Sequence, residues 1–278
     1  MTDPAAHRFA CAAMGTTFEV TIVGEDPAYA RQLAGDAFAE LRRVERELSR
    51  FVPSSDVSRI NRLTAGQTVR VGAATYECLR VAAQVDAATD GAFDVTVGAG
   101  LTAARAGMEM VTLSADDNAV TVGAAGVKVD LGGIGKGYAV DRIVEFLGEW
   151  GVAAALVHGG ESTVLGKGGA PGGEPWTVGL RAPGSEDSQL ERVRLRDRAL
   201  SGSGALIHGR HIIDPRTGRP APRAAAWASA PTGTLADALS TAFMVMADDE
   251  IERCCARLPE VGAAVLGTSA LEHFGHWP

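Results

Sequence analysis

The pattern of apolar and polar residues predicts a strand and a long helix at the start of the chain. Phe18, Val20 and Ile22 alternate with polar residues, which is the two-residue period of a half-buried strand. Between residues 26 and 48, apolar side chains recur at steps of three and four, separated by Arg and Glu. This spacing lines one face of a helix with apolar side chains and leaves the other face charged.

Further along, helices and strands are predicted to follow one another without a fixed rhythm. The pair Ser54-Ser55 offers an N-cap for a helical turn over residues 56–61, and a helix over 73–88 should end near Gly91. Strands are expected at residues 127–131, 154–157, 163–165, 176–180, 193–195, 211–213, 224–228 and 263–266, and helices at 235–247 and 250–258. Because no strict strand–helix–strand repeat is present, the expected fold class is α+β.

The composition is that of a globular protein without a nucleic-acid partner. The chain has 278 residues, 46% of them apolar, which suffices for a substantial core in one large domain or two closely packed lobes. Its formal net charge of −8 would repel a nucleic-acid backbone.

The spacing of the cysteines and the lack of long apolar runs favour a location in the cytoplasm. The four cysteines, at positions 11, 78, 254 and 255, lack metal-type spacing, so a reducing compartment is expected. Residues 1–10 lack the apolar core of a secretory signal, and Cys11 is not expected to carry a lipid. Without a run of ~18 apolar residues no transmembrane segment is predicted, and the chain as given is expected to be cytoplasmic.

The segment 129–141 is the strongest candidate for a binding site. It joins an apolar stretch to an amphipathic helix through four glycines, with Asp130 and Lys136 between and beside them. Glycines let backbone N–H groups approach an anion, and the first turn of a helix leaves donors unpaired. Lysine occurs only at positions 128, 136 and 167, so its presence here is unusual for this chain. The segment predicts either a phosphate-binding loop or a tight turn with an exposed lysine.

Several further motifs accompany this segment in a fixed order. They are Met14-Gly15-Thr16, Ser49-Arg50-Phe51 with residues 55–61, GAFDVTVG at 91–98, ALVHGGE at 155–161, HIIDPRTG at 211–218 and ADALSTA at 236–242. In this order, from about Met14 to about Met246, the chain resembles the ApbE-like family of FAD:protein FMN transferases. Segments 129–141 and 211–218 carry most of the resemblance.

The resemblance implies both a fold and a reaction. The fold is an ApbE-like α+β arrangement of mixed and antiparallel sheets, a single domain of two lobes over residues 8–278 with the ligand cleft between them, after an extension of residues 1–7. The reaction moves FMN from FAD to a threonine hydroxyl of a partner flavoprotein, with Mg²⁺ and release of AMP. Some family members act at the membrane in the periplasm.

Two oxygen-bearing side chains suit a magnesium ion. Asp237 and Thr241 stand four residues apart on a predicted helix, so their oxygens project from one face. Mg²⁺ prefers oxygen ligands and keeps water or phosphate oxygens in its other positions. The resemblance adds the backbone carbonyl of Gly133. The alternative is that Asp237 complements the helix dipole and Thr241 packs in the core.

The proton of an attacking hydroxyl requires a base. The imidazole of His211 can accept a proton near neutral pH, and Asp214, three residues along, is a candidate to orient it. The alternative is that His211 is a hydrogen-bonded structural residue and that Asp214 holds the turn that follows it.

The remaining candidate residues bind the dinucleotide. By resemblance, the ligand contacts are Met14, Phe51, Ala92, Phe93, Asp94, Asp130, Lys136 and Ile213. Met14 and Phe51 suit flat rings, although either could be a core residue. Asp94 could serve only its own turn, and Asp130 could cap the turn of Gly132 and Gly133.

Some positions differ from the family pattern and leave two alternatives open. Phe51 stands where tyrosine is commoner, while His158 and Glu161 replace the usual Asn and Asp. The loops after Gly98 and Gly204 are shortened. The alternatives to transfer are an FAD pyrophosphatase that yields free FMN and AMP, and a non-catalytic FAD-binding protein.

Overall fold

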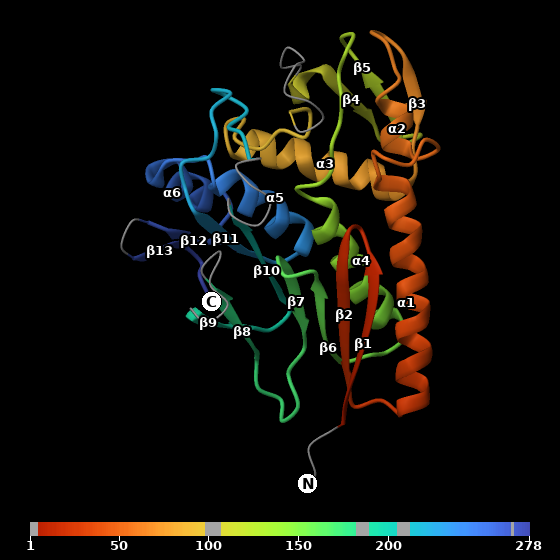
Figure 1. Ribbon diagram of the computed structural model, residues 1–278, viewed down its shortest axis with the longest axis vertical. Helices are drawn as coiled ribbons and strands as arrows, with labels where there is room; N and C mark the ends of the chain where they lie inside the picture. Colours follow the sequence, from red (N-terminus) through yellow and green to blue (C-terminus); the bar gives the residue numbers. More distant parts are fainter. Residues whose placement is uncertain (1–4, 98–106, 182–188, 205–211, 268–269) are drawn as a thin grey trace.

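A sheet of eight strands forms the centre of the computed structural model, which describes residues 5–97, 107–181, 189–204, 212–267 and 270–278 (Figure 1). The strand order is β1-β2-β6-β7-β10-β11-β12-β13, and each neighbouring pair is antiparallel. The strands are β1 (Ala6–Ala13), β2 (Thr16–Val23), β6 (Ala154–Gly159), β7 (Thr163–Lys167), β10 (Arg198–Gly204), β11 (Ala225–Ala230), β12 (Gly262–Leu266) and β13 (Leu271–Gly275).

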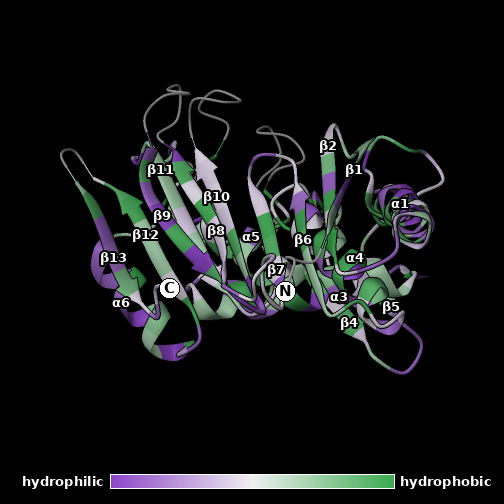
Figure 2. Cartoon of the chain, turned by 90° about the horizontal axis from the view of Figure 1, so that it is seen from below, coloured by the Kyte–Doolittle hydropathy of each residue, from purple (hydrophilic) through white to green (hydrophobic). Residues whose placement is uncertain are grey.

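The described part of the chain has six helices, of which four pack on strands of this sheet and two pack on those helices. They are α1 (Pro27–Leu48), α2 (Asp56–Ile60), α3 (Ala73–Ala88), α4 (Gly135–Glu149), α5 (Gly233–Phe243) and α6 (Asp248–Arg257). α4 packs on β6 and β7, and α5 packs on β10 and β11. Figure 2 shows α1 at the β1 end of the sheet and α6 at the β13 end. α5 is buried on nearly all sides, which explains its apolar composition.

Two small sheets complete the fold. The hairpin of β8 (Trp176–Arg181) and β9 (Gln189–Leu195) shares a second core with the other face of the large sheet. Neighbouring residues of β10 show the two faces, because Ala199 belongs to the helix-side core and Leu200 to this second core. The other small sheet has the order β3-β5-β4, formed by β3 (Thr68–Arg70), β4 (Val111–Ser114) and β5 (Ala119–Val122), and a single 3-10 turn, η1 (Met108–Met110), precedes β4.

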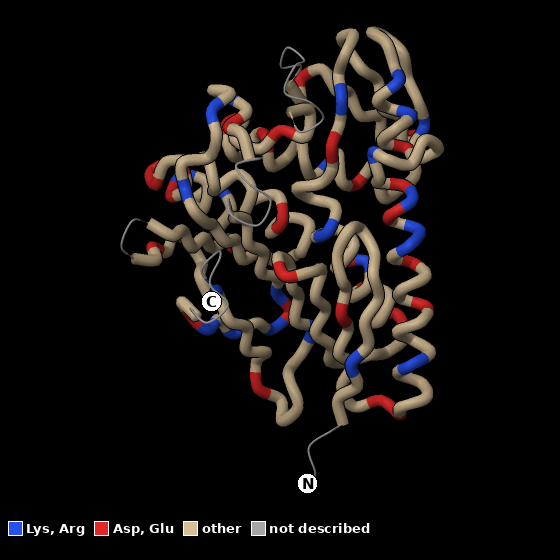
Figure 3. Tube along the Cα trace, viewed as in Figure 1, with Lys and Arg blue, Asp and Glu red and all other residues tan. Residues whose placement is uncertain are grey.

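Side-chain caps mark the first turns of two helices, and the cap of α2 is the one that the sequence predicted. Asp26 caps α1 by accepting the N–H groups of Ala28 and Tyr29, and Ser55 caps α2 by accepting the N–H of Ser58. Acidic and basic residues are interspersed along α1 (Figure 3), where Arg43 pairs with Glu40 and Glu47. The expected helices over 73–88, 235–247 and 250–258 are confirmed within a few residues, and the α+β class is confirmed.

The prediction of a strand at residues 127–131 is wrong. Val127, Val129 and Leu131 are buried as the alternation predicted, but no neighbouring strand pairs with them in the described part of the chain. The side-chain amide of Asn61 takes the place of a strand, since it donates to the carbonyl of Val129 at 2.9 Å and accepts its N–H at 2.6 Å. Alternation reports the two faces of an extended segment but not its partner.

Other strand predictions need correction. In place of a strand at 211–213, the described residues contain a single bridge between Ile213 and Pro220, and His211 lies outside the described residues. The strands β1, β3, β4, β5, β10 and β13 were not expected; several are short, and β1 is rich in alanine, which is a poor strand former. β1 begins at Ala6, inside the segment expected as an extension. None of the described helices has the length and apolar character needed to cross a bilayer.

Candidate active site

A glycine turn (residues 131–135) leads into α4 and is held by Asp130. The carboxylate of Asp130 accepts the N–H of Gly132 at 2.9 Å through Oδ1. Its Oδ2 lies 3.3 Å from Nε of Arg50. The structural role considered for Asp130 is therefore present, and the arginine that precedes Phe51 ties the loop after α1 to the glycine turn.

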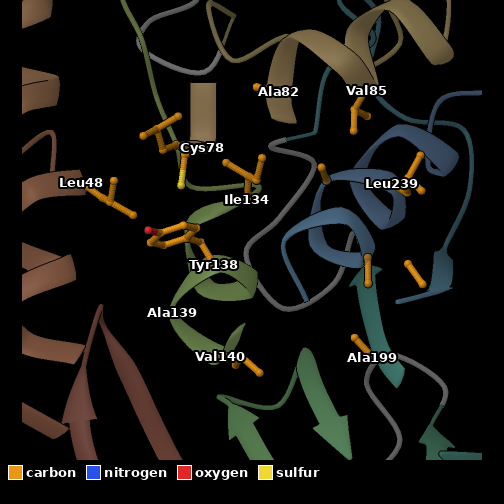
Figure 4. Close-up of a cluster of buried hydrophobic side chains, with 14 of the residues drawn as sticks. Leu48, Cys78, Ala82, Val85, Ile134, Tyr138, Ala139, Val140, Ala199 and Leu239 are labelled. Atoms are coloured by element: carbon orange, nitrogen blue, oxygen red, sulfur yellow. The ribbon is translucent and has the colours of Figure 1, made fainter. Parts of the chain in front are cut away.

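Apolar anchors fix the start of α4 in the core. Figure 4 shows Ile134, the residue before α4, and Tyr138 of its first turns among Leu48, Cys78 and Leu239. Ile134 is fully buried and Tyr138 nearly so. Because these side chains come from α1, α3, α4 and α5, the position of the glycine turn is set by core packing.

The helices α4 and α5 cross at two glycines. A Cβ on Gly137 would overlap the carbonyl oxygen of Gly233 and lie 2.8 Å from Cβ of Asp237. At this crossing a carboxylate of each helix accepts backbone N–H groups at the start of the other helix. Asp237 of α5 accepts the N–H of Gly137 at 3.0 Å, and Asp141 of α4 accepts the N–H groups of Gly233 and Thr234 at 2.5 and 2.8 Å. These carboxylates satisfy N–H groups that have no partner within their own helix.

Asp141 is a buried carboxylate with an altered pKa. Burial raises its pKa from 3.8 to about 6, although the hydrogen bonds from Thr234 and Gly233 act in the opposite direction. Between pH 4 and 6 the folded state therefore binds more protons than the unfolded state, and the stability contributed by this group falls as the pH rises. The free-energy cost of burying the ionised carboxylate is fully present above pH 6, and protonation relieves it as the pH falls toward 4.

We expect the Asp141→Asn variant to show this linkage. As the pH falls from 7.5 to 5, wild type should gain stability relative to the variant, by about 1 kcal/mol and by no more than about 3 kcal/mol at still lower pH. Urea unfolding of both proteins at each pH measures the difference, in which other titrating groups cancel. A difference that stays constant with pH would contradict the assignment.

The proposed metal ligands lie together. Asp237 is 3% exposed on α5, and Thr241 one turn later donates its hydroxyl proton to the backbone carbonyl of Asp237 at 3.3 Å, which leaves its lone pairs available. A Cβ on Gly133 would lie 3.3 Å from Oγ1 of Thr241, so the glycine turn and α5 are in contact. A carboxylate, a hydroxyl and a nearby backbone carbonyl are the hard oxygen donors that suit Mg²⁺. The residues present fit the ion.

Hydroxyl groups of the sheet surround these residues and were missed by the sequence reasoning. Ser201 of β10 and Thr163 of β7 donate to Oδ1 of Asp237 at 3.3 and 3.5 Å. Ser203 of β10 lies 3.3 Å from Oγ1 of Thr241. The signal was the alternation Ser201-Gly202-Ser203, since a strand turns every second side chain to the same face. The close fit of Trp227 against Gly202 on the opposite face explains the glycine.

Two of the expected nucleotide contacts lie in the core. Ala92 and Phe93 are almost fully buried, and Cε2 of Phe93 would lie 3.3 Å from a Cβ on Gly133. Asp94 accepts the N–H and the hydroxyl of Thr96 through Oδ1 at 2.8 and 2.7 Å. Its other oxygen, Oδ2, is buried without a hydrogen-bond partner. Asp94 thus has the expected turn role and one acceptor left over.

Met14 and Phe51 have different surroundings. Met14 occupies the turn between β1 and β2 with a φ of 52°, and its N–H donates to Oε1 of Glu45 at 2.6 Å. Its Cε would lie 3.4 Å from a Cβ on Gly135, which places this thioether beside the glycine turn. Phe51 is 80% exposed, and the guanidinium of Arg50 lies 4.6 Å from its ring centroid. Its ring is therefore available at the surface and is not a core residue.

The carboxylate of Asp214 is engaged by a neighbouring arginine. It accepts hydrogen bonds from the backbone N–H of Arg216 at 2.9 Å and from the Nε–H of the same residue at 3.0 Å. Arg216 also forms an ion pair with Glu250. Burial raises the pKa of Asp214, but the hydrogen bonds from Arg216 outweigh it and the pKa is lowered. Asp214 holds the turn that follows Ile213.

His158 and Glu161 flank a tight turn after β6. His158 is half-buried on β6 opposite Glu19 of β2, and burial lowers its pKa. Glu161 is exposed, and Gly160 between them has a φ of 68°. The described residues contain no cluster of three His, Cys, Asp or Glu side chains able to hold a metal, so one carboxylate supported by neutral oxygens is the available donor set.

Known proteins are similar to this chain in sequence and in fold. A family model described as the ApbE family matches residues 14–266. An FAD:protein FMN transferase of Salmonella typhimurium is 27% identical over 92% of this chain and 83% of its own, and one of Treponema pallidum is 30% identical over 89% and 80%. Among solved structures, the Pseudomonas stutzeri flavinyl transferase ApbE has a TM-score of 0.83 at 27% identity, covering 98% of this chain and 95% of that one. The Thermotoga maritima apbe protein has a TM-score of 0.84 at 27% identity, with 97% of both chains covered.

Proposed function

The chain belongs to the ApbE family and is a transferase, and we propose that it moves FMN from FAD to a threonine hydroxyl of an acceptor flavoprotein in a Mg²⁺-dependent reaction that releases AMP. The observation that carries this proposal is the meeting of the glycine turn with α5. Thr241 lies against Gly133, and Asp237 lies between the start of α4 and the hydroxyls of the sheet.

The proposed residues divide the work of phosphoryl transfer. Asp237, Thr241 and the Gly133 carbonyl would hold Mg²⁺, which when bound neutralises charge on the diphosphate. Lys136 adds a cationic charge in the first turn of α4, where the helix dipole also favours an anion. The exposed ring of Phe51 and the thioether of Met14 offer apolar surface to flat rings. We propose that the FAD diphosphate lies over the glycine turn.

The reaction balances as a single displacement. The threonine oxygen attacks the phosphorus on the FMN side of FAD, a new phosphorus–oxygen bond forms, and the bond to the AMP phosphate breaks. The hydroxyl proton must pass to a base, for which we propose His211. Because Asp214 is occupied by Arg216, we propose that Asp214 shapes the turn after His211 and leaves proton transfer to the imidazole.

We expect the purified protein to flavinylate a competent acceptor. Incubation with FAD, Mg²⁺ and an acceptor flavoprotein should add the mass of FMN to the acceptor, and AMP should appear in equal amount. EDTA should remove the activity, since the metal supplies several kcal/mol of transition-state stabilisation. Intact-mass spectrometry and chromatography of the nucleotide measure both products.

The controls separate the alternatives. An acceptor with its target threonine replaced by alanine should gain no mass, while an established ApbE-family transferase should flavinylate the unaltered acceptor. Free FMN and AMP without an acceptor would indicate a pyrophosphatase. Tight FAD binding that ignores Mg²⁺, with no product, would indicate a binding protein and would overturn the proposal.

A further inference from the structure

Lys136 stands beside the carboxylate that would bind the metal. Its Nζ lies 3.8 Å from Oδ1 of Asp237 and 3.4 Å from the carbonyl oxygen of Gly132. The Lys136 side chain is 26% exposed and the Asp237 side chain 4% exposed. One ammonium group therefore lies between the carboxylate of α5 and the Gly132 carbonyl of the glycine turn.

Asp237 is already compensated in this arrangement. Oδ2 accepts the N–H of Gly137 at the positive end of α4, and Oδ1 receives hydroxyl protons from Ser201 and Thr163. Among the described residues, Lys136 is the one cationic side chain within ion-pair distance of Asp237. A divalent cation that approached Oδ1 would meet the positive charge of this ammonium a few ångströms away, and that repulsion is strong where little water screens it.

Lysine is suited to leave this position. Its ammonium is a compact charge on a flexible four-carbon stem, and a diphosphate offers it a stronger anionic partner than one carboxylate. Of the other two lysines, Lys128 donates to the carbonyl of Asn61, and Nζ of Lys167 lies beside Gly148, where an added Cβ would be 3.3 Å away.

We propose that Lys136 is the resident counter-ion of Asp237 and withholds the metal site until the diphosphate of a flavin dinucleotide draws the ammonium away. This inference rests on the proposed function, since it requires that Asp237 bind the metal. FAD should then raise metal affinity, and the metal should raise FAD affinity by the same factor. The pair would load together, and the free protein would hold little metal.

The test is a titration of Mn²⁺, an analogue of Mg²⁺, into the full chain, followed by the electron paramagnetic resonance of the free ion. We expect weak binding to wild type alone and binding at least about tenfold tighter with FAD present. The Lys136→Met variant, which keeps length and loses charge, should bind Mn²⁺ at least about tenfold tighter than wild type without FAD. The matched control is Lys128→Met, which should titrate like wild type.

Each outcome has a distinct meaning. If no protein binds Mn²⁺ even with FAD, or if Asp237→Asn binds it as well as wild type, the proposed metal site fails. If wild type binds Mn²⁺ with FAD but Lys136→Met without FAD binds it no better than wild type alone, only the role of Lys136 is wrong.

A second measurement uses wild type alone and tests the proposal even if the Lys136→Met variant does not fold. Reductive methylation with ¹³C-formaldehyde labels the three lysines and the N-terminus of wild type, and each methylated amine gives its own resonance. Addition of FAD with Mg²⁺ should move the Lys136 resonance and leave those of Lys128 and Lys167 in place. An unmoved Lys136 resonance in a protein that has bound both ligands would overturn the proposal.

Discussion

Replacement of Asp237 by alanine should abolish flavin transfer, with a loss of roughly 10²-fold or more in rate. The expected loss follows from the metal, because Asp237 is the one charged ligand in the proposed set and a metal contributes several kcal/mol to the stabilisation of transition-state charge. The side chain is 4% exposed, so solvent cannot easily replace its oxygen. Transfer of FMN to the acceptor, measured by intact mass over time, gives the rate.

Asp237 has a structural role that the experiment must separate from the chemical one. Its Oδ2 accepts the N–H of Gly137, and removal of that acceptor should cost about 1–3 kcal/mol of stability. Asp237→Asn keeps an acceptor for this bond and removes the charge, so it should fold better than the alanine variant and remain inactive. The matched control Asp249→Ala removes an exposed carboxylate of α6 and should retain activity. Full transfer by Asp237→Asn would remove Asp237 from the metal site.

Replacement of Gly137 by alanine should be among the most damaging single-methyl changes in the chain. The added Cβ would overlap the carbonyl of Gly233 and press on Cβ of Asp237, and both belong to a packed helix. Overpacking of this kind typically costs about 1–3 kcal/mol, and backbone contacts of this closeness place it at the upper end or beyond. Separation of α4 from α5 would also move the glycine turn away from Thr241 and Asp237, so activity should fall with stability.

A second helical glycine supplies the control. Gly35 lies on the exposed side of α1, and a Cβ there would meet nothing within 4 Å. Gly35→Ala should therefore stabilise the protein by up to about 1 kcal/mol, because alanine favours a helix. Urea unfolding of the two variants should shift in opposite directions. A Gly137→Ala variant as stable and active as wild type would mean that the two helices do not approach as closely as the structure has them.

The glycines of the 129–141 segment have one role that the sequence predicted and another that only the structure shows. Four glycines and a lysine before a helix predicted an anion-binding turn, but Gly137 is required for the crossing of α4 and α5. Asp141, in the same segment, ties the start of α5 to α4. Neither role could be predicted, since both depend on a helix about a hundred residues further along the chain.

The sequence by itself determined the features that depend on neighbouring residues. The period of apolar residues determined α1 and β2, the cap of α2 follows from local hydrogen bonding of a serine, and the ordered motifs indicated the family. The predictions of helices, strands and caps succeed because periodicity, alternation and capping involve groups within a few positions of one another.

Only the tertiary structure decided how those elements meet. It replaced the strand at 127–131 by a segment held by the amide of Asn61, and it brought Ser201 and Thr163 of two strands to Asp237 of α5. It also placed the ammonium of Lys136 against that carboxylate. Contacts between distant residues are set by the packing of the whole core, in which each partner is chosen by shape and burial as well as by chemical type.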